Sequence, residues 1–304
     1  MWSSFIFNTP LDSRDRLGTE FKSISFLWEQ GLRMVPRPVA LNREYHCAIY
    51  EFIKGVPLGV DILQKDIDHA VDFLEILRIL SLRPKSMDLS GASEAYFCVK
   101  DTVHSIQSRL DRIDSGTSGE EYDQLRAFLN EQFIPLFNNV AVWSRDHLEE
   151  NRIPYDAMLA EQLRTLSPSD FGFHNALRIS DDKIVFLDFE YFGWDDPAKL
   201  VSDFLWHPAM SIPEDFKTYF VQRMAMIFKK DPCFKARLKG VFPLFGLKWC
   251  LIFLNEFIST ESERRDFARP LGRNKTAVRL EQLIKAKRLS KKIKAMYKDF
   301  PYGN

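Results

Sequence analysis

The sequence predicts an α+β fold, in which a short segment that mixes helix and strand precedes a large, mainly helical remainder. Two patterns predict it. Apolar side chains recur at helical spacing over long stretches of the chain. Between these stretches, the run ALRISDDKIVFLD sets two apolar segments around a polar turn, which is typical of a β-hairpin. With 304 residues and 45% apolar side chains, the chain can bury a large core.

Helices are predicted on both sides of this hairpin. Residues 14–31 and 61–82 have apolar side chains at helical spacing, and only the run FIFN offers a strand before the first of them. Residues 119–149 are predicted to form one long helix or a broken pair, with Pro135 as the break. Further helices are expected at residues 213–229, 240–258 and 275–298.

Three polar residues in and before the hairpin carry the main functional signal. Asp170 is followed five residues later by Asn175, and Asp188 lies inside the apolar run IVFLDFEYF. An unpaired charge in such a run would be costly, so Asp188 is expected to have a partner. Phosphoryl transfer from a nucleotide needs one carboxylate near the attacking hydroxyl, and an amide oxygen and a second carboxylate that hold Mg²⁺. The three residues fit that set.

The spacing predicts where two of these side chains meet. If Asp181 and Asp182 form a two-residue turn, Asn175 lies directly opposite Asp188, and such side chains are about 5 Å apart. Glu190 would share the face of Asp188 and could add a third metal ligand. Asp-Asp is not a favoured turn pair, and a slip of one residue would destroy the alignment.

The same residues carry a family resemblance. D-F-G-F-H-N resembles the catalytic loop of the aminoglycoside phosphotransferase and choline kinase superfamily, which has a protein-kinase-like two-lobe fold. D-F-E-Y followed by G-W-D-D-P-A resembles the metal-binding segment of that group, and choline kinases in particular. The resemblance implies that Asp170 is the catalytic base, that Asn175 and Asp188 bind Mg²⁺, and that Asp203 braces the catalytic loop. Pro168 replaces the histidine that the family usually has two residues before the base.

The resemblance extends toward the N-terminus. MVPRPVALN is similar to the turn and strand after the family's glutamate-bearing helix, and CAIYEFIKGVPL to the strand and hinge that hold adenine. It implies that Glu20 is the glutamate that pairs with a nucleotide-binding lysine. It also implies that the backbone at Glu51, Phe52 and Ile53 meets the adenine of ATP.

In the family, the Gly-rich loop that covers the phosphates and the nucleotide-binding lysine both precede the helix that carries the glutamate. In this sequence the first glycine is Gly18 and the first lysine is Lys22, and both lie within the predicted helix 14–31. Two interpretations follow: a truncated gene product or fragment, which we favour, and a naturally reduced relative with weak nucleotide binding or none. Arg14 or Arg16 could replace part of the lysine's charge. The resemblance makes residues 1–55 a remnant of the nucleotide-binding N-lobe and hinge, with an incomplete sheet. Residues 56–304 form the helical C-lobe, which holds the catalytic hairpin and the metal site.

Composition narrows the setting. Lys and Arg number 42, as do Asp and Glu, so no net field points to nucleic acid. Four scattered cysteines predict buried thiols in a reducing compartment rather than a zinc site. MWSSFIFN is not a signal peptide, and the apolar run VFPLFGLKWCLIFLNEF is interrupted by Lys248 and too short to span a membrane. We expect a cytoplasmic protein whose basic terminal helix, residues 275–298, packs through its apolar stripe.

These observations lead to two hypotheses. The first is an ATP-dependent phosphotransferase that moves the γ-phosphate to the hydroxyl of a small molecule. The second is a non-catalytic binding module of kinase-like shape. An amine-bearing acceptor would suit a pocket of Tyr191, Trp194, Asp195 and Asp196 with Trp249 and Glu256, although core packing and helix capping explain these residues better. His174 is expected to pack the loop rather than relay protons, and His207 to end a helix rather than bind a ligand.

Overall fold

The computed structural model describes residues 2–5, 15–59, 61–113, 118–180, 182–258 and 274–303. The chain divides into two compact units. The first unit comprises Met1–Ala95, Leu159–Phe234 and Gly303, and it holds every predicted catalytic and metal-binding residue. The second unit comprises Tyr96–Met158, Lys235–Tyr302 and Asn304.

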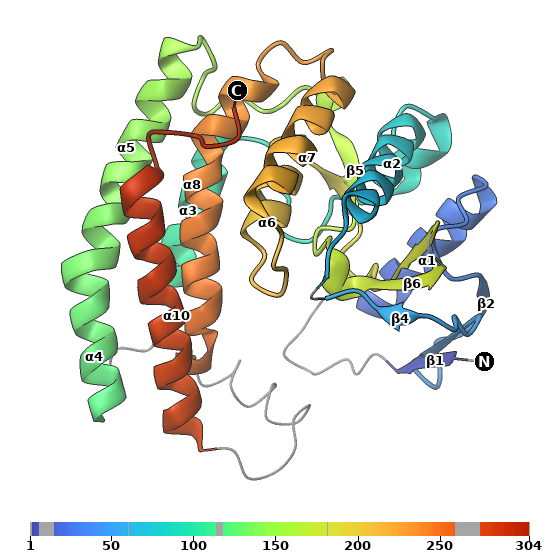
Figure 1. Cartoon of the computed structure of the whole chain (residues 1–304), viewed down its shortest axis with the longest axis horizontal. Helices are drawn as coiled ribbons and strands as arrows, with labels where there is room; N and C mark the ends of the chain where they lie inside the picture. The colour runs from blue at the N-terminus through green and yellow to red at the C-terminus, as the bar shows by residue number, and fades with distance from the viewer. Residues whose placement is uncertain are drawn as a thin grey trace. The chain divides into compact units, whose positions relative to one another are not determined.

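The first unit begins with a three-stranded antiparallel sheet and one helix (Figure 1). The sheet order is β1 (Trp2–Phe5), β3 (Cys47–Tyr50), β2 (Pro38–Asn42). Helix α1 (Arg16–Glu29) starts at Asp15, whose carboxylate accepts a hydrogen bond of 2.9 Å from the Gly18 N–H, because the first N–H groups of a helix lack partners within it. Strand β1 takes the place of the predicted FIFN strand and overlaps it only at Phe5, since most of FIFN lies outside the described residues.

The predicted hairpin is present, but its predicted register is wrong. Strands β6 (Ala176–Ser180) and β7 (Lys183–Phe186) pair antiparallel, and β4 (Val56–Pro57) adds to the outer edge of β6. Ser180 lies opposite Lys183 as expected, but a bulge then shifts the register, so that Arg178 lies opposite Ile184. The Leu187 N–H consequently donates to the Asn175 carbonyl over 2.8 Å, and Asn175 is not opposite Asp188. One extra residue on β6 explains the shift.

An aromatic cluster joins this hairpin to the helices of the first unit. Phe73 of α2 (Gln64–Leu80) lies 4.6 Å from the ring of Phe186 on β7 and 5.6 Å from that of Phe171. Phe204 of α6 (Pro197–Trp206) stacks at 4.1 Å on Phe220 of α7 (Glu214–Ile227). Phe171 also stacks on Phe204 at 5.7 Å, so one buried set of rings fixes the segment that carries Asp170. A two-stranded ladder, β5 (Thr165–Ser167) with β8 (Gly193–Asp195), frames the same segment.

The second unit is helical. Its helices are α3 (Val99–Asp111), α4 (Glu120–Phe128), α5 (Ile134–Glu150), α8 (Phe234–Phe253) and α10 (Lys275–Met296). The first residue of α8, Phe234, is assigned to the first unit. Residues 119–149 form the broken pair that was one of the two predicted alternatives: a π-helical turn at Leu129–Phe133 links α4 to α5 and ends just before Pro135. Helix α5 runs beside α8, where the buried Ser144 hydroxyl donates to the Gly240 carbonyl over 2.8 Å (Figure 1). Among the described residues, four short 3₁₀ segments lie outside the α-helices: Pro84–Asp88, Glu161–Leu163 and Phe173–Asn175 in the first unit, and Leu254–Phe257 in the second.

The apolar stretch around α8 is longer than the sequence indicated. The helical run Phe234–Phe257 has 24 residues and is long and apolar enough to cross a membrane by length and composition alone. The prediction that it is too short was therefore wrong. However, 72% of its most apolar window is buried inside the protein, which is typical of a core helix.

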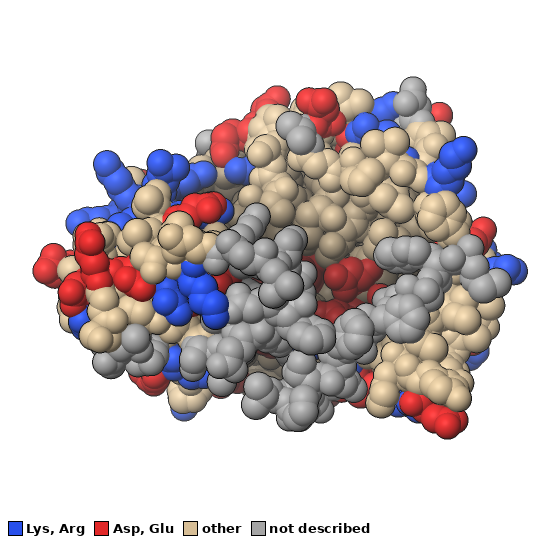
Figure 2. Space-filling model, turned by 90° about the horizontal axis from the view of Figure 1, so that it is seen from below, with Lys and Arg blue, Asp and Glu red and all other residues tan. Residues whose placement is uncertain are grey.

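Charge and cysteines follow the sequence analysis in part. Basic and acidic side chains are interspersed over the face shown in Figure 2. The four cysteines are free thiols, but only Cys250 is fully buried, whereas Cys47, Cys98 and Cys233 are half-buried.

Candidate active site

The segment that carries Asp170 connects β5 to β6 and is held by its own backbone. The Asp170 N–H donates to the Pro168 carbonyl over 2.9 Å, and the Ser169 N–H donates to the Ser167 hydroxyl over 2.9 Å. Ser169 has a φ of 66°, a left-handed conformation that is uncommon for a residue other than glycine. Its hydroxyl donates to the Ser93 carbonyl over 3.0 Å, which offsets the strain. Pro168 therefore keeps a tight turn in which its own missing N–H is not needed.

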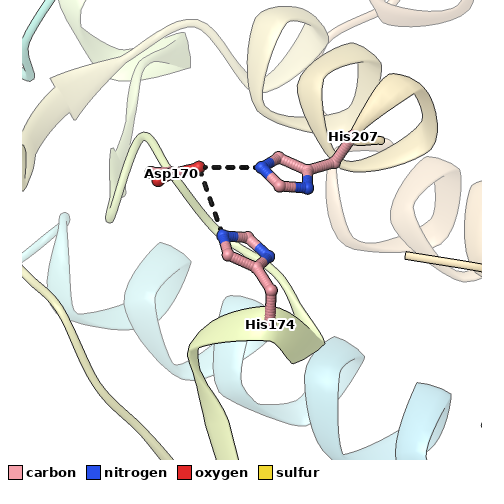
Figure 3. A group of neighbouring side chains, drawn as sticks. All are labelled: Asp170, His174 and His207. Atoms are coloured by element: carbon pink, nitrogen blue, oxygen red, sulfur yellow. Dashed lines mark ion pairs between the residues drawn. The ribbon is translucent and has the colours of Figure 1, made fainter. Parts of the chain in front are cut away.

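Two histidine rings face the Asp170 carboxylate. Oδ1 of Asp170 lies 3.4 Å from Nε2 of His174 and 3.2 Å from Nε2 of His207 (Figure 3). The two rings stack with centroids 3.8 Å apart and planes within 6°. Burial raises the pKa of Asp170, but hydrogen bonding and attraction from the two histidines outweigh it and hold this pKa well below its ordinary range. Asp170 is thus ionised throughout the physiological range.

Asn175 and Asp188 reach this segment in different ways. The Asn175 side-chain amide donates to the Asp170 carbonyl over 3.2 Å, which leaves its oxygen Oδ1 as the atom able to bind a metal. Asp188 has a φ of 63°, which turns the chain directly after β7. Burial raises the pKa of Asp188 to about 6, assisted by repulsion from Glu190 and Asp170. Asp188 is therefore close to both carboxylates, although the ladder does not place it opposite Asn175.

Glu20 of α1 joins this acidic group. It is 7% exposed, accepts a hydrogen bond of 3.2 Å from the Tyr50 hydroxyl, and is bonded by the Phe189 N–H. Burial raises its pKa to about 7, together with repulsion from Asp188 and Glu190. The structure thus brings Glu20 to the segment after β7.

A cation one helical turn earlier meets the same group. Nη1 of Arg16 lies 2.9 Å from Oε1 of Glu190, and its guanidinium lies 5.2 Å from the centroid of the Tyr191 ring. Arg16 thus offsets one of the negative charges near Asp188. Arg14, the other candidate for this part, lies outside the described residues.

The residues present fit a magnesium ion. Asn175, Asp188 and Glu190 offer only oxygen ligands, which Mg²⁺ prefers. Burial, together with repulsion from Glu190 and Asp170, raises the pKa of Asp188, and a divalent cation would favour the ionised form of this carboxylate. Glu190 is paired with Arg16, so it can ligate a metal only if that ion pair opens.

The predicted adenine-binding segment lies between the sheet and the hairpin. The Glu51 N–H donates to the Arg37 carbonyl over 2.9 Å, and Phe52 is 57% exposed. Directly beyond Ile53, Val56 and Pro57 of β4 pair with β6. The segment therefore connects the first sheet to the catalytic hairpin, and adenine binding there stays a prediction.

Asp203 reaches the catalytic loop through a lysine that the sequence analysis missed. Nζ of Lys199 lies 2.8 Å from Asp195 and 3.1 Å from Asp203, and it donates to the Ser169 hydroxyl over 3.3 Å. Lys199 is 1% exposed and Asp195 is fully buried. Burial raises the pKa of Asp195 to about 6, although Lys199 opposes this. The detectable signal was the spacing D-x3-K-x3-D: Lys199 and Asp203 share one face of α6, and Asp195 ends β8 just before the N-cap of that helix.

The carboxylates considered for an amine pocket have structural partners. Asp195 is paired with Lys199, and Asp196 accepts the Ala198 N–H over 2.8 Å at the start of α6. The expected cap, with Pro197 as the first helical residue, is confirmed. Trp249 and Glu256 belong to the second unit.

Comparison with known proteins supports the fold. No protein-family model and no curated protein sequence matches the chain. Among solved structures, a choline kinase from Streptococcus pneumoniae matches with a TM-score of 0.56 and 12% identity, over 95% of this chain and 85% of that one. A spectinomycin phosphotransferase in complex with ADP and its substrate matches with a TM-score of 0.59 and 12% identity, over 92% and 93%. An ethanolamine kinase from Plasmodium vivax matches with a TM-score of 0.54 and 12% identity, over 93% and 75%.

The chain therefore has the protein-kinase-like α+β fold, as the sequence predicts. The resemblance to choline kinases and aminoglycoside phosphotransferases is confirmed at the level of the fold. Because these identities are low, the roles of individual residues rest on the geometry of this site.

Proposed function

We propose that the protein is a magnesium-dependent phosphotransferase that moves the γ-phosphate of ATP to the hydroxyl of a small molecule in the cytoplasm. The observation that carries this proposal is the meeting of the Asp170 and Asp188 segments at Asn175, whose amide donates to the Asp170 carbonyl over 3.2 Å and whose carbonyl accepts the Leu187 N–H over 2.8 Å. Asp170 is held ionised beside Asp188 and Glu190, and Arg16 offsets only part of their negative charge. This is the arrangement that an acceptor site beside a metal site requires.

Asp170 orients the acceptor. Its Oδ1 faces His174 and His207, so we assign Oδ2 to the acceptor hydroxyl. An ionised carboxylate accepts the hydrogen bond of that hydroxyl and then its proton as the phosphoryl group is transferred. Most of the catalytic effect in this chemistry comes from positioning and electrostatics, so the rigid loop around Asp170 is as important as its charge.

Asn175, Asp188 and, after release from Arg16, Glu190 would hold Mg²⁺. When bound, Mg²⁺ neutralises charge on the transferred phosphate. The neighbours crystallised with ADP or AMP support nucleotide binding by this fold. Choline, ethanolamine and spectinomycin are named for the neighbours, and they define the class of acceptor to test: hydroxyl compounds that carry an amine or a quaternary ammonium group.

A non-catalytic binding module is the second candidate. Arg16 already pairs with Glu190, and Tyr50 already bonds Glu20. Two of the acidic groups thus have partners within the protein. A non-catalytic binding module would therefore need no metal ion at this site.

Thermal unfolding with and without Mg·ATP separates the two candidates. We expect stabilisation of the wild type, and loss of that stabilisation in Asp188→Ala. Asp182→Ala is the matched control, because this aspartate is exposed beside the hairpin turn. A wild type that does not respond to Mg·ATP would favour the binding module.

Transfer of labelled phosphate to choline, ethanolamine and spectinomycin tests the role of Asp170. Asp170→Ala should keep its response to Mg·ATP and lose about 10²- to 10⁴-fold in turnover, the usual contribution of a general base. Wild-type turnover in this variant would rule out Asp170 as the base.

A further inference from the structure

Asp170 shares a convergent set of donor atoms with His174 and His207, two residues to which the proposed phosphoryl transfer gives no role. One ligating atom from each of the three side chains lies within 4.8 Å of the others. His174 comes from the turn before β6, and His207 follows the last residue of α6 (Figure 3). Two separate elements of the first unit thus direct imidazole nitrogens at one carboxylate oxygen.

The distances match the edges of a metal tetrahedron. Zinc binds histidine nitrogen at about 2.0–2.1 Å and carboxylate oxygen at about 2.0–2.2 Å, so neighbouring ligands of a tetrahedral site lie about 3.4 Å apart. In this structure, Oδ1 of Asp170 lies 3.2 Å from His207 Nε2 and 3.4 Å from His174 Nε2. These two distances match two of the three edges that the ligand atoms would share, and all three atoms lie within 4.8 Å of one another. The two rings stack face to face, so they would have to turn for both Nε2 atoms to point at one ion.

His174 supplies an independent observation. Both of its ring nitrogens are buried; within the described part of the chain Nδ1 has no hydrogen-bond partner, and Nε2 has the long contact of 3.4 Å with Oδ1 of Asp170. Buried polar groups in native proteins are almost always satisfied, and an exception points to a water molecule or an ion. A metal bound to Nε2 would satisfy one of the two nitrogens.

We propose that Asp170, His174 and His207 bind a transition-metal ion, with Zn²⁺ as the best match. Two imidazoles and one carboxylate suit zinc, whereas Mg²⁺ prefers oxygen ligands alone. The site is therefore distinct in ligand chemistry from that of Asn175, Asp188 and Glu190. His207 caps the C-terminus of α6 as expected, and the proposal gives it a second role.

The protons can be accounted for within the site. Nδ1 of His207 accepts a 3.3 Å hydrogen bond from the Ala209 N–H, so without a metal the ring proton is on Nε2. Metal binding moves that proton to Nδ1 and opens the contact with Ala209, which is exposed on a turn. Asp170 is already ionised and needs to lose no proton.

The site would control access to Asp170. A metal held by this carboxylate competes with the acceptor hydroxyl, so Zn²⁺ would inhibit transfer while Mg·ATP remains bound. This consequence rests on the proposed function. The binding of the metal does not, because it depends only on the three side chains.

Co²⁺ and Zn²⁺ are the probes for the test, used on the metal-free full chain. Co²⁺ should give the intense visible absorption of a four-coordinate site, and Zn²⁺ should displace the Co²⁺. Competition with a chromophoric chelator then measures the affinity for Zn²⁺. His174→Ala and His207→Ala should each weaken Zn²⁺ binding by at least about 10- to 100-fold, since loss of even a supporting residue around a metal has that effect. The matched control is His104→Ala, an exposed histidine on α3 that should bind as the wild type.

Several outcomes would overturn the proposal. Wild-type Zn²⁺ affinity in either histidine variant would do so, as would displacement of Co²⁺ by Mg²⁺ at equal concentration. If an alanine variant unfolds, His207→Gln keeps the size of the side chain and serves instead. A Co²⁺ spectrum in a protein that ignores Mg·ATP would support the metal site and reject the phosphotransferase. Response to Mg·ATP without Co²⁺ binding would reject only the metal site.

Discussion

The segments around Asp170 and Asp188 each hold an aspartate, but the surroundings of the two side chains shift the pKa in opposite directions. Both carboxylates are largely buried, and burial raises the pKa of each. Around Asp170, two histidines reverse the effect and the pKa falls well below its ordinary range. Around Asp188, Glu190 and Asp170 add to it and the pKa rises to about 6.

The difference shows how one site can divide two tasks between identical groups. The Asp170 segment carries its own compensation, since ring nitrogens face the carboxylate and Lys199 supports the loop through Ser169. The Asp188 segment has excess negative charge, which Arg16 offsets only in part. The first has its positive charge within the protein, and the second has an excess of negative charge that a cation would offset.

The largest effect should come from removing the buried support of the Asp170 segment. Lys199→Met leaves Asp195 and Asp203 without their shared cation, and breaking a buried pair destabilises by about 3–5 kcal/mol. Denaturant unfolding at pH 7 measures this loss. Lys285→Met is the matched control, because its pair with Glu281 has the same sequence spacing but is exposed, and should contribute less than about 1 kcal/mol. Equal stability of both variants would contradict the proposed support.

Neutralising Asp188 should raise the free energy of unfolding, whereas removing the charge of Lys199 should lower it. Its pKa is about 6 in the folded protein against an ordinary 3.8, so the folded state keeps a proton that the unfolded chain has already lost. Ionisation therefore destabilises the fold as pH rises from about 4 to about 6, and the penalty persists above that. Asp188→Asn should raise the free energy of unfolding by up to about 3 kcal/mol at pH 8, from 1.36 kcal/mol per pKa unit.

The gain in Asp188→Asn should shrink toward zero near pH 4. Denaturant unfolding across this pH range measures it, with the exposed Asp182→Asn as the control. A gain that does not depend on pH would mean that repulsion at Asp188 is not its source.

Mg²⁺ should relieve the same repulsion. At a concentration ten times its dissociation constant, it should stabilise the wild type at pH 8 by about 1.4 kcal/mol. The effect should be lost in Asp188→Asn, and lost in the wild type at pH 5, where Asp188 holds a proton. Isothermal titration with Mg²⁺ alone measures the binding. Undiminished binding by the variant would place the ion elsewhere.

The smallest effect should come from the hydroxyl that supports Glu20. Tyr50→Phe removes a hydrogen bond of 3.2 Å that favours the ionised form of Glu20, so it should reduce stability by about 1 kcal/mol above pH 7 and by less when Glu20 is protonated. Unfolding at pH 8 and pH 5 measures both values. Tyr45→Phe is the control, since Tyr45 is 71% exposed. The same loss at both pH values would disconnect the hydroxyl from the charge of Glu20.

The sequence predicted the fold well where burial is periodic. Residues 61–82 form α2 within a few residues of the predicted ends, because one face of this helix is apolar. Residues 275–298 form α10 as predicted, but the helix is buried at Leu283, Ala286, Ser290 and Ile293, and Ile284 is exposed. Helix α3 was missed, since most of its side chains are polar and it buries only Val99, Thr102 and Ile106. The π-helical turn before Pro135 has no pattern of its own.

The site was predicted less completely, for a different physical reason. Asp170 and Asp188 stood out because a charge in an apolar or glycine-containing run is unusual. His207 did not, because its partner Asp170 lies 37 positions away in the sequence. Lys199 was missed although its ion-pair partners Asp195 and Asp203 are only four positions away, because nothing local links it to Ser169, 30 positions earlier. The hairpin register failed because a bulge depends on how the turn closes, which the residue pattern does not specify.

The bulge beside Ile179 also separates the tip of the hairpin from its base. Ser180 and Lys183 keep one register, while Arg178 and every pair toward Asn175 keep another. The extra residue, Ile179, therefore accommodates the difference between the two registers at a single position of β6. A change in the length of the tip has a place to be absorbed before it reaches Asn175, so the turn can vary in evolution without moving the residues that do the chemistry.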